Sequence, residues 1–278
     1  MITMTCYDLH SHSIASDGAL SPADLIARAI SQGVDVLALT DHDGTEGIAA
    51  AQEASQNTDL TLITGVEISV TWGGGTVHIL GLNVDVNNAT LQQGLMAMRS
   101  YRIDRAAKMA ERLEKAGITG ALDGARKYSS DVMLGRLHFA QFLVEHGHAK
   151  NISDVFKRFL VRNKPGYVAG EWASLTDAVT WITAAGGQAV IAHPARYKMT
   201  ATKLRRLISE FKDAGGVGFE VVSGRQHPEE VKNLARLAEQ FELVASCGSD
   251  FHTPDNTWVE LGHLAALPKS CVPIWSTW

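Results

Sequence analysis

The chain has few cysteines and no long apolar run. Its three cysteines, Cys6, Cys247 and Cys271, are widely spaced among 278 residues and form no Cys-x-x-Cys pair. This pattern predicts reduced thiols, and it disfavours both a disulfide-stabilised secreted domain and a thiolate metal site. No apolar stretch approaches the roughly 18 to 20 residues of a membrane span, and the first residues show neither a basic nor an apolar leader segment. We therefore expect a cytoplasmic protein without a membrane partner.

Basic residues are scarce in the first third of the chain. Residues 1–87 hold one, Arg28, against eleven acids. Residues 88–172 hold fourteen lysines and arginines against eight acids, and the remainder is close to balanced, with ten basic and eleven acidic residues. An acidic segment beside a basic one suits a cation site that faces an anionic substrate, although charge alone equally fits a solvated helical face.

Motifs for covalent catalysis are also missing. We find no Ser-His-Asp arrangement and no phosphate-binding loop. The glycine run Gly73-Gly74-Gly75 fits a tight hairpin turn better than a phosphate cradle.

Apolar runs alternate with helical patterns over much of the chain. Strands are predicted near 6–10, 36–40, 60–67, 76–82, 188–192, 217–222 and 243–248. Helices are predicted from Ser21-Pro22 onward and over 45–56, 200–214 and 227–241. This alternation predicts an α/β fold with a parallel sheet closed as a barrel, whose active residues lie at the carboxyl ends of the strands.

The alternation stops between about 88 and 187, where the pattern is mostly helical, near 89–116, 136–146, 152–162 and 175–185. We expect residues 1–87 and 188–278 to form the barrel, and residues 88–187 to form a helical insert with a return helix over the active face. Arg99, Arg102 and Arg105 share one side of the long helix. Arg102 also falls within its apolar stripe (Leu91, Leu95, Met98, Met109 and Leu113), where an anionic ligand would stabilise it. Arg136 and Arg158 are further candidate anion-binding residues.

Histidines and acids recur at the ends of the predicted strands. Imidazole and carboxylate are the ligands that suit zinc, manganese or iron. A single histidine at a strand end is more often a hydrogen-bonded core residue than a ligand, but that explanation does not fit so many in equivalent positions. The nine candidate metal ligands are His10, His12, Asp17, His42, Glu67, His78, His193, Asp250 and His252.

The ordered motifs resemble those of the PHP (polymerase and histidinol phosphatase) family of metal-dependent phosphoesterases, from residue 8 to about 268. They are Asp8-Leu9-His10-Ser11-His12, Leu39-Thr40-Asp41-His42-Asp43, Gly65-Val66-Glu67-Ile68-Ser69, His78-Ile79-Leu80-Gly81, Ala192-His193-Pro194 and Gly248-Ser249-Asp250-Phe251-His252. Arg99-Ser100-Tyr101-Arg102, Gly135-Arg136 and Ala195-Arg196-Tyr197 further resemble one subgroup, the nucleoside 3′,5′-bisphosphate phosphatases that also act as 5′-to-3′ exoribonucleases. Leu137 departs from that subgroup, which often has proline there.

The resemblance implies a distorted seven-stranded (β/α) barrel with a trinuclear centre. His10, His12, Glu67 and Asp250 would hold one ion. Glu67, as a bridging carboxylate, would hold a second with His78 and His193, and Asp17, His42 and His252 would hold the third. Manganese is the expected ion, with zinc or iron possible, and Asp41 and Asp43 would orient histidines or relay protons during catalysis.

The resemblance also implies hydrolysis of the 3′-phosphate of nucleoside 3′,5′-bisphosphates and 5′-to-3′ cleavage of short 5′-phosphorylated RNA. Arg99, Tyr101, Arg102, Arg136, Arg158 and Arg196 would bind the substrate. Two alternatives remain open at this point. One is a phosphatase for histidinol phosphate or another small phosphomonoester, and the other is a non-catalytic, metal-stabilised nucleic-acid-binding module. No protein partner is evident.

Overall fold

The computed structural model describes residues 5–128 and 134–278. The chain folds into two compact units. One, the barrel unit, comprises Met1–Leu95 and Ala173–Trp278; the other, the helical unit, comprises Met96–Trp172. Helix α3 (Ala89–Lys115) begins in the barrel unit and ends in the helical unit.

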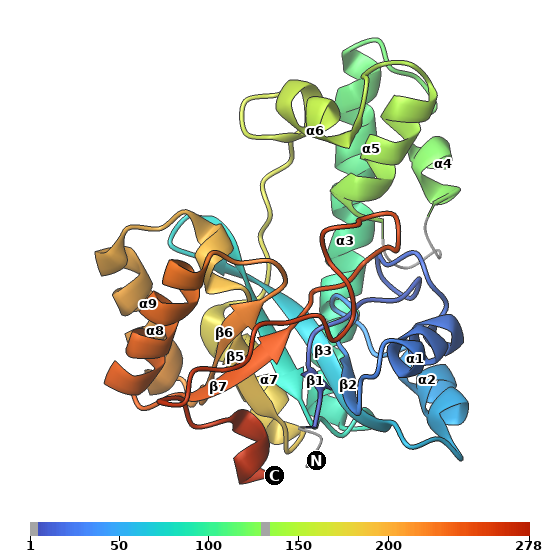
Figure 1. Cartoon of the computed structure of the whole chain (residues 1–278). Helices are drawn as coiled ribbons and strands as arrows, with labels where there is room; N and C mark the ends of the chain where they lie inside the picture. Colours follow the sequence, from blue (N-terminus) through green and yellow to red (C-terminus); the bar gives the residue numbers. More distant parts are fainter. Residues whose placement is uncertain (1–4, 129–133) are drawn as a thin grey trace. The chain divides into compact units, whose positions relative to one another are not determined.

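The barrel unit is built on one seven-stranded sheet in which the strands follow chain order (Figure 1). All seven predicted strands are present. They are β1 (Tyr7–Asp8), β2 (Val36–Leu39), β3 (Thr61–Trp72), β4 (Gly75–Leu82), β5 (Gln188–Ile191), β6 (Gly218–Ser223) and β7 (Val244–Gly248).

The sheet is not wholly parallel, so the prediction of a parallel barrel was wrong in one place. Strand β4 runs antiparallel to both β3 and β5. The cause is local, because Gly73 and Gly74, with φ angles of 55° and 79°, join β3 directly to β4. A two-residue turn of this kind can connect only antiparallel strands. The expected hairpin at the glycine run is therefore confirmed.

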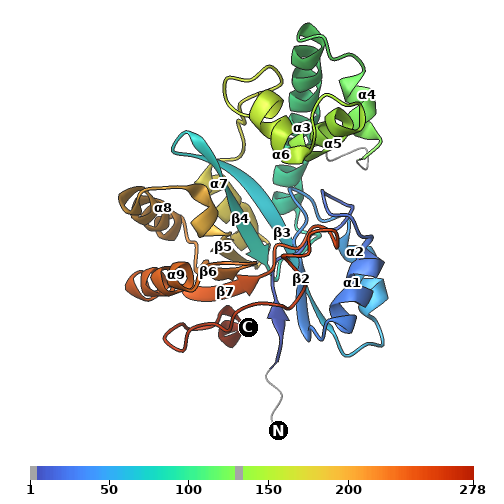
Figure 2. The same cartoon turned by 45° about the horizontal axis from the view of Figure 1, so that its top comes forward.

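The two edges of the sheet approach each other just beyond β1 and β7. The Leu9 N–H donates to the Cys247 carbonyl at 2.9 Å, and Ser11 forms a parallel bridge with Phe251. These contacts make the barrel nearly closed, as Figure 2 shows around the strand ends. They also bring the segment after β1 beside the segment after β7.

Helices of the barrel unit cover the sheet, and their starts follow ordinary capping rules. The Ser21 side chain accepts from the Asp24 N–H at the start of α1, with Pro22 in the first turn. The other helices are α2 (Ile48–Ser55), α7 (Leu175–Ala184), α8 (Ala201–Asp213) and α9 (Pro228–Gln240), with short 3₁₀ turns η2 (Pro194–Tyr197) and η3 (Ile274–Thr277).

The barrel core lies between these helices and the strands. Ile68, Ile79, Phe211 and Phe219 are among its fully buried side chains. Strands buried on both faces require continuous apolar runs, which explains why β2 and β6 read as nearly unbroken hydrophobic segments.

The helical unit has its own core. It contains the second half of α3, α4 (Ala121–Arg126), α5 (Arg136–Glu145), α6 (Ile152–Val155) and the π-helix η1 (Phe156–Leu160). The sequence pattern did not indicate α4 or the π-helical turn. The apolar stripe of α3 serves two cores, since Leu91 and Leu95 pack in the barrel unit whereas Met109 and Leu113 pack with Phe139 in the helical unit.

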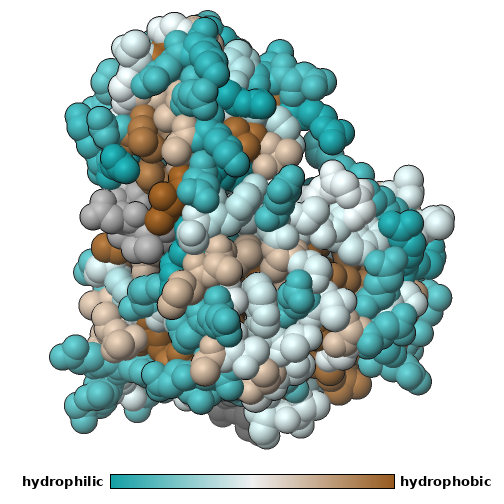
Figure 3. Space-filling model, turned by 180° about the vertical axis from the view of Figure 1, so that it is seen from behind, coloured by the Kyte–Doolittle hydropathy of each residue, from teal (hydrophilic) through white to brown (hydrophobic). Residues whose placement is uncertain are grey.

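The surface is largely polar on the face drawn in Figure 3, with smaller hydrophobic areas between hydrophilic side chains. Within residues 5–128 and 134–278, no helix is long and apolar enough to cross a membrane.

Candidate metal centre

The loop after β1 carries two buried imidazoles that point to the same place. Asp250 N–H donates to the His10 carbonyl and His12 N–H donates to the Phe251 carbonyl, both at 2.9 Å. This pairing fixes the two segments in register. Because His10 and His12 are two residues apart in extended chain, their rings share one side, and their Nε2 atoms lie 3.2 Å apart.

Glu67 is the residue around which the other side chains gather. The apolar run before Glu67 predicted a strand that ends there, but β3 continues to Trp72, so that prediction was wrong. Pairing with β4 extends the strand to Trp72. Glu67 itself forms a parallel bridge with His42, which lies just after the carboxyl end of β2. The Glu67 side chain is fully buried.

Five imidazoles surround the Glu67 carboxylate. Oε1 lies 2.9 Å from His78 Nδ1 and 2.9 Å from His193 Nε2. Oε2 lies 3.1 Å from His42 Nδ1, 3.2 Å from His12 Nε2 and 3.4 Å from His10 Nε2. Residues from β1, β2, β3, β4 and β5 and the loops that follow them thus meet at one carboxylate.

Two further acids complete the cluster. Asp250 Oδ1 lies 3.2 Å from the Nε2 atoms of both His10 and His12. Asp17 Oδ1 lies 3.3 Å from His252 Nε2, and Asp17 Oδ2 lies 3.9 Å from His42 Nε2. The structure therefore brings together all nine side chains that sequence analysis selected as metal ligands.

Backbone geometry at the cluster is unusual. Asp43, His193 and Asp250 have positive φ angles of 46°, 29° and 55°. Non-glycine residues in this region cost about 1 to 3 kcal/mol each, and such strain concentrates at functional sites. Its presence at three predicted site residues fits a centre whose side-chain directions are fixed by the surrounding structure.

The acids and imidazoles perturb one another strongly. Burial alone would raise the pKa of the Glu67 carboxyl, but His42, His78 and His10 hold that pKa well below its usual range. Burial would lower the pKa of the His12 imidazole, yet Asp250 and Glu67 raise it to about 10, and the pKa of His10 is likewise raised well above normal. His42 differs, because burial lowers its pKa to about 4.

The donor set fits divalent cations. Among the described residues, three groups have donor atoms within 4.8 Å of one another: His10, His12, Glu67 and Asp250; His12, Asp17, His42 and His252; and His42, Glu67 and His78. Glu67 Oε2, His42 Nδ1, Asp17 Oδ1 and His193 Nδ1 are buried and make no hydrogen bond among the described residues. Buried polar atoms without hydrogen bonds call for a ligand. His12 and His42 each fall in two groups, a sharing that sequence analysis did not foresee.

Glu220 belongs to this cluster, although sequence analysis did not select it. It is fully buried in β6, its Oε1 lies 3.1 Å from His10 Nδ1, and its Oε2 accepts from the His193 N–H. A carboxylate on Nδ1 leaves Nε2 of the same ring available as a ligand. The signal in the sequence was an acid within the apolar strand 217–222.

Asp41 and Asp43 are engaged by neighbouring groups. Asp41 Oδ1 accepts from the Ser13 N–H at 2.8 Å and from the Ser16 hydroxyl at 2.6 Å, while its Oδ2 accepts from the Ser13 hydroxyl at 2.7 Å. Ser16 Oγ in turn lies 3.5 Å from His12 Nδ1. Asp43 Oδ1 accepts from the Ser69 N–H at 2.7 Å. These contacts suit carboxylates that hold the site's loops in place.

The candidate substrate-binding residues divide between the two units. Arg196, in the barrel unit, forms an ion pair with Asp250 Oδ2. The other five lie in the helical unit. There the Tyr101 hydroxyl donates to the Ala169 carbonyl at 3.0 Å, and the Arg158 guanidinium donates to the His148 carbonyl at 2.6 Å.

Arg102, Arg105 and Arg136 form a basic cluster in the helical unit. Arg102 and Arg105 are 9% and 5% exposed, and their guanidinium carbons lie 4.9 Å and 5.2 Å from the centre of the Trp172 ring. Burial, together with the positive charges of Arg136 and Arg102, lowers the pKa of Arg105 to about 10. Arg136 opens helix α5, whose N-terminus also favours an anion.

Comparison with known proteins places these observations in a family. The PHP domain matches residues 8–221. A 3′,5′-nucleoside bisphosphate phosphatase from Chromobacterium violaceum is 47% identical over 98% of this chain and 96% of its own length. A 5′-3′ exoribonuclease from Escherichia coli is 45% identical over 98% of this chain and 93% of its own length.

The fold is also found in a solved structure. An amidohydrolase from Chromobacterium violaceum, solved with bound sulfate and no metal, aligns with a TM-score of 0.92 and 47% identity. The alignment covers 97% of this chain and 94% of that one. From the matched motifs, the nearly closed barrel and the full-length relatives, it follows that the chain belongs to the PHP family.

Proposed function

We propose that this chain is a metal-dependent phosphoesterase that hydrolyses the 3′-phosphate of nucleoside 3′,5′-bisphosphates and also removes 5′-mononucleotides from short 5′-phosphorylated RNA. The convergence of five imidazoles on the buried Glu67 carboxylate carries this proposal, since it provides the donors of a multinuclear centre. Relatives of nearly full length named for both activities support the substrate class.

The proposed ligand sets are those of the resemblance, with Glu67 shared between His10, His12 and Asp250 on one side and His78 and His193 on the other. Asp17, His42 and His252 would hold a third ion. Manganese is the proposed ion, and the oxygen and nitrogen donors also suit zinc or iron. When bound, divalent cations would acidify a water molecule and neutralise charge on the phosphoryl oxygens.

The phosphatase and exoribonuclease activities use the same reaction, hydrolysis of a P–O3′ bond. Water adds to the phosphorus, the P–O3′ bond breaks, and the 3′-oxygen leaves with a proton. With a bisphosphate the products are a 5′-mononucleotide and inorganic phosphate. With RNA the products are the same 5′-mononucleotide and a shortened strand that carries a new 5′-phosphate. A site that positions this one bond therefore serves both substrates.

We assign the substrate's 5′-phosphate to the basic cluster of the helical unit, with Arg99, Tyr101 and Arg158 as further contributors. Arg196, in the barrel unit, is a further proposed substrate-binding residue. Arg102, Arg105 and Arg136 support this assignment because their positive charges repel one another, and an anion relieves that repulsion. Guanidinium forks also bind phosphate bidentately. Asp41 and Asp43 are proposed to hold the loops that carry the ligands during catalysis.

A parallel assay tests the proposal. Nucleoside 3′,5′-bisphosphate, histidinol phosphate and 5′-phosphorylated RNA are offered to the purified protein with manganese, and product formation is measured for each. We expect turnover of the bisphosphate and the RNA in preference to histidinol phosphate. Preferential hydrolysis of histidinol phosphate would instead support the small-phosphomonoester alternative. Binding of RNA without hydrolysis of any of the three would support the non-catalytic binding module.

A further inference from the structure

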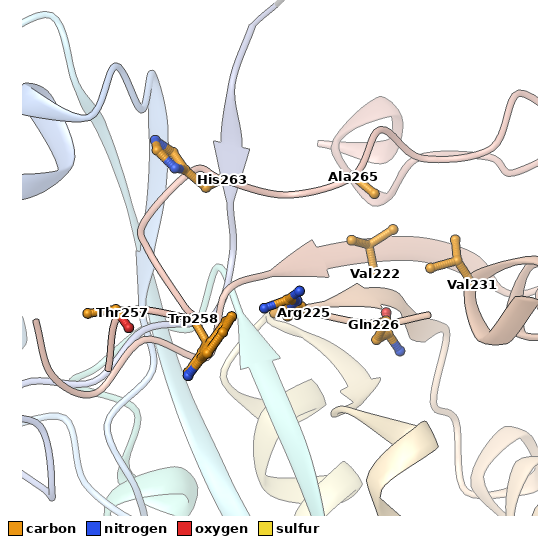
Figure 4. A pocket seen from close by; sticks show the side chains of 9 residues that line it. Val222, Arg225, Gln226, Val231, Thr257, Trp258, His263 and Ala265 are labelled. Atoms are coloured by element: carbon orange, nitrogen blue, oxygen red, sulfur yellow. The ribbon is translucent and has the colours of Figure 1, made fainter. Parts of the chain in front are cut away.

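A cavity lies in the barrel unit, with a volume of about 340 Å³ (Figure 4). This size falls within the usual range for small-ligand pockets. Arg225 and Gln226, which follow β6, line one part of it, and Thr257, Trp258 and His263, which follow β7, line another. No acidic residue occurs among the described residues that line it.

The Arg225 guanidinium lies over the Trp258 ring in this cavity. The Arg225 guanidinium carbon lies 4.5 Å from the centre of the Trp258 ring, and Trp258 is 69% exposed. The backbone of the loop is held around Trp258, because the Trp258 backbone N–H donates to Asn256 Oδ1 at 3.3 Å and the Val259 N–H donates to the Asn256 carbonyl at 3.1 Å. Exposed aromatic and guanidinium planes are the surfaces on which unpaired nucleobases stack.

Gln226, which lines the same cavity, carries a buried hydrogen-bond donor. Gln226 Oε1 accepts from the Ser223 N–H at 2.7 Å, which fixes the orientation of the amide group. Its Nε2 is buried and makes no hydrogen bond to any residue that the structure describes. A buried amide donor without a partner suits a ligand with acceptor atoms, such as the edge of a nucleobase.

The cavity borders the metal centre. Gly224, on its rim, donates to the Gly248 carbonyl at 2.8 Å. A Cβ atom at Gly224 would lie 2.8 Å from the Ser249 carbonyl oxygen and 3.4 Å from Arg196 Nη2. Arg196 is the residue that forms an ion pair with Asp250. The Arg196 side chain therefore links the rim of the cavity at Gly224 to Asp250, a candidate metal ligand.

We propose that the Trp258–Arg225 cavity binds the nucleobase on the 3′ side of the scissile phosphodiester. The inference rests on the proposed function. A nucleoside 3′,5′-bisphosphate has no nucleotide at that position, so the cavity distinguishes RNA from the mononucleotide substrate. The exposure of Trp258 fits this role, because the strand beyond the stacked base must continue into solvent. Recognition by stacking also implies tolerance of different bases.

The test compares two substrates in Trp258→Ala, a nucleoside 3′,5′-bisphosphate and a 5′-phosphorylated dinucleotide or pentanucleotide. Loss of one stacked base should lower kcat/KM on the oligonucleotides by about 5- to 150-fold and leave the bisphosphate unchanged. Trp258→Phe should restore most of the loss, since it keeps an aromatic plane. Trp278→Ala, which removes another exposed tryptophan of the same unit, should affect neither substrate.

Binding to the chelator-treated protein gives a second readout that needs no turnover. Fluorescence anisotropy of a labelled 5′-phosphorylated pentanucleotide should show weaker binding by Trp258→Ala and near-normal binding by Trp258→Phe. Equal losses on bisphosphate and RNA, or unchanged RNA affinity and turnover, would overturn the inference. A changed oligomeric state in Trp258→Ala, with unchanged RNA binding and turnover, would also overturn it. If the wild-type protein hydrolysed neither substrate, the proposed function would be refuted but the role of Trp258 would not. The anisotropy measurement of RNA binding would still decide that role.

Discussion

The Nδ1 atom of His10 lies 3.1 Å from Oε1 of Glu220, and both side chains are fully buried. Because this carboxylate also accepts from the His193 N–H, one acid orients elements after β1 and β5. Neighbouring groups that hold a ligating histidine commonly change metal affinity by about 10- to 100-fold when they are removed.

Glu220→Gln should therefore weaken metal binding by about 10- to 100-fold while the fold is retained. Gln preserves the size of the side chain but removes the negative charge that favours Nδ1–H on His10. A competition titration with a metal-binding dye measures the change, and circular dichroism checks the fold. Glu239→Gln, a change in the same unit at an exposed residue of α9, serves as the control. Unaltered affinity in Glu220→Gln would contradict the orienting role.

The purified protein should contain roughly two to three divalent ions per chain. Elemental analysis measures the content, and a chelator should abolish phosphoesterase activity. Glu67→Gln and His193→Ala should each remove turnover without unfolding the protein, because both change atoms at the centre of the cluster. His146→Ala, at an exposed histidine of the helical unit, should retain full activity. A metal-free protein with chelator-insensitive activity would exclude the proposed centre.

Metal binding should release protons. In the metal-free protein the pKa of His12 is about 10 and that of His10 is raised well above normal, so both rings are cationic imidazoliums, protonated on both nitrogens, at neutral pH. A cation must displace those protons, so on the order of one to two protons should leave per chain. Affinity should rise with pH toward about 10 and fall as the solution becomes more acidic. Calorimetry in buffers of different ionisation enthalpy measures the release, and buffer-independent heats would contradict it.

Arg102→Ala or Arg136→Ala should lower kcat/KM for a nucleoside 3′,5′-bisphosphate by about 10- to 150-fold, as expected for loss of a charged hydrogen bond. Hydrolysis of a simple aryl phosphate, which has no second phosphate, should change little. Arg126→Ala, an exposed arginine of the same unit paired only with Asp123 among the described residues, is the control. Equal losses on both substrates would show that the arginines support the fold.

Many features of this protein were readable from local sequence. The capped start at Ser21-Pro22, the glycine turn at Gly73-Gly74 and the apolar runs of the seven strands depend on neighbours in the chain, so pattern reasoning found them. The candidate ligands were also visible, because imidazoles and carboxylates that interrupt apolar strands are costly unless they bind something.

Other features depend on residues that are distant in the chain. The sequence could not place Glu67 within a strand, because the extension of β3 to Trp72 depends on its pairing with β4. It did not reveal the pairing of Glu220 with His10, which joins residues 210 positions apart. Nor did it show that His12 lies within reach of three acids and His42 within reach of two. The sequence by itself determined which chemical groups are present and which segments are strands. Only the tertiary structure decided which groups meet, because burial and electrostatic coupling arise between side chains that the fold, and not the chain order, brings together.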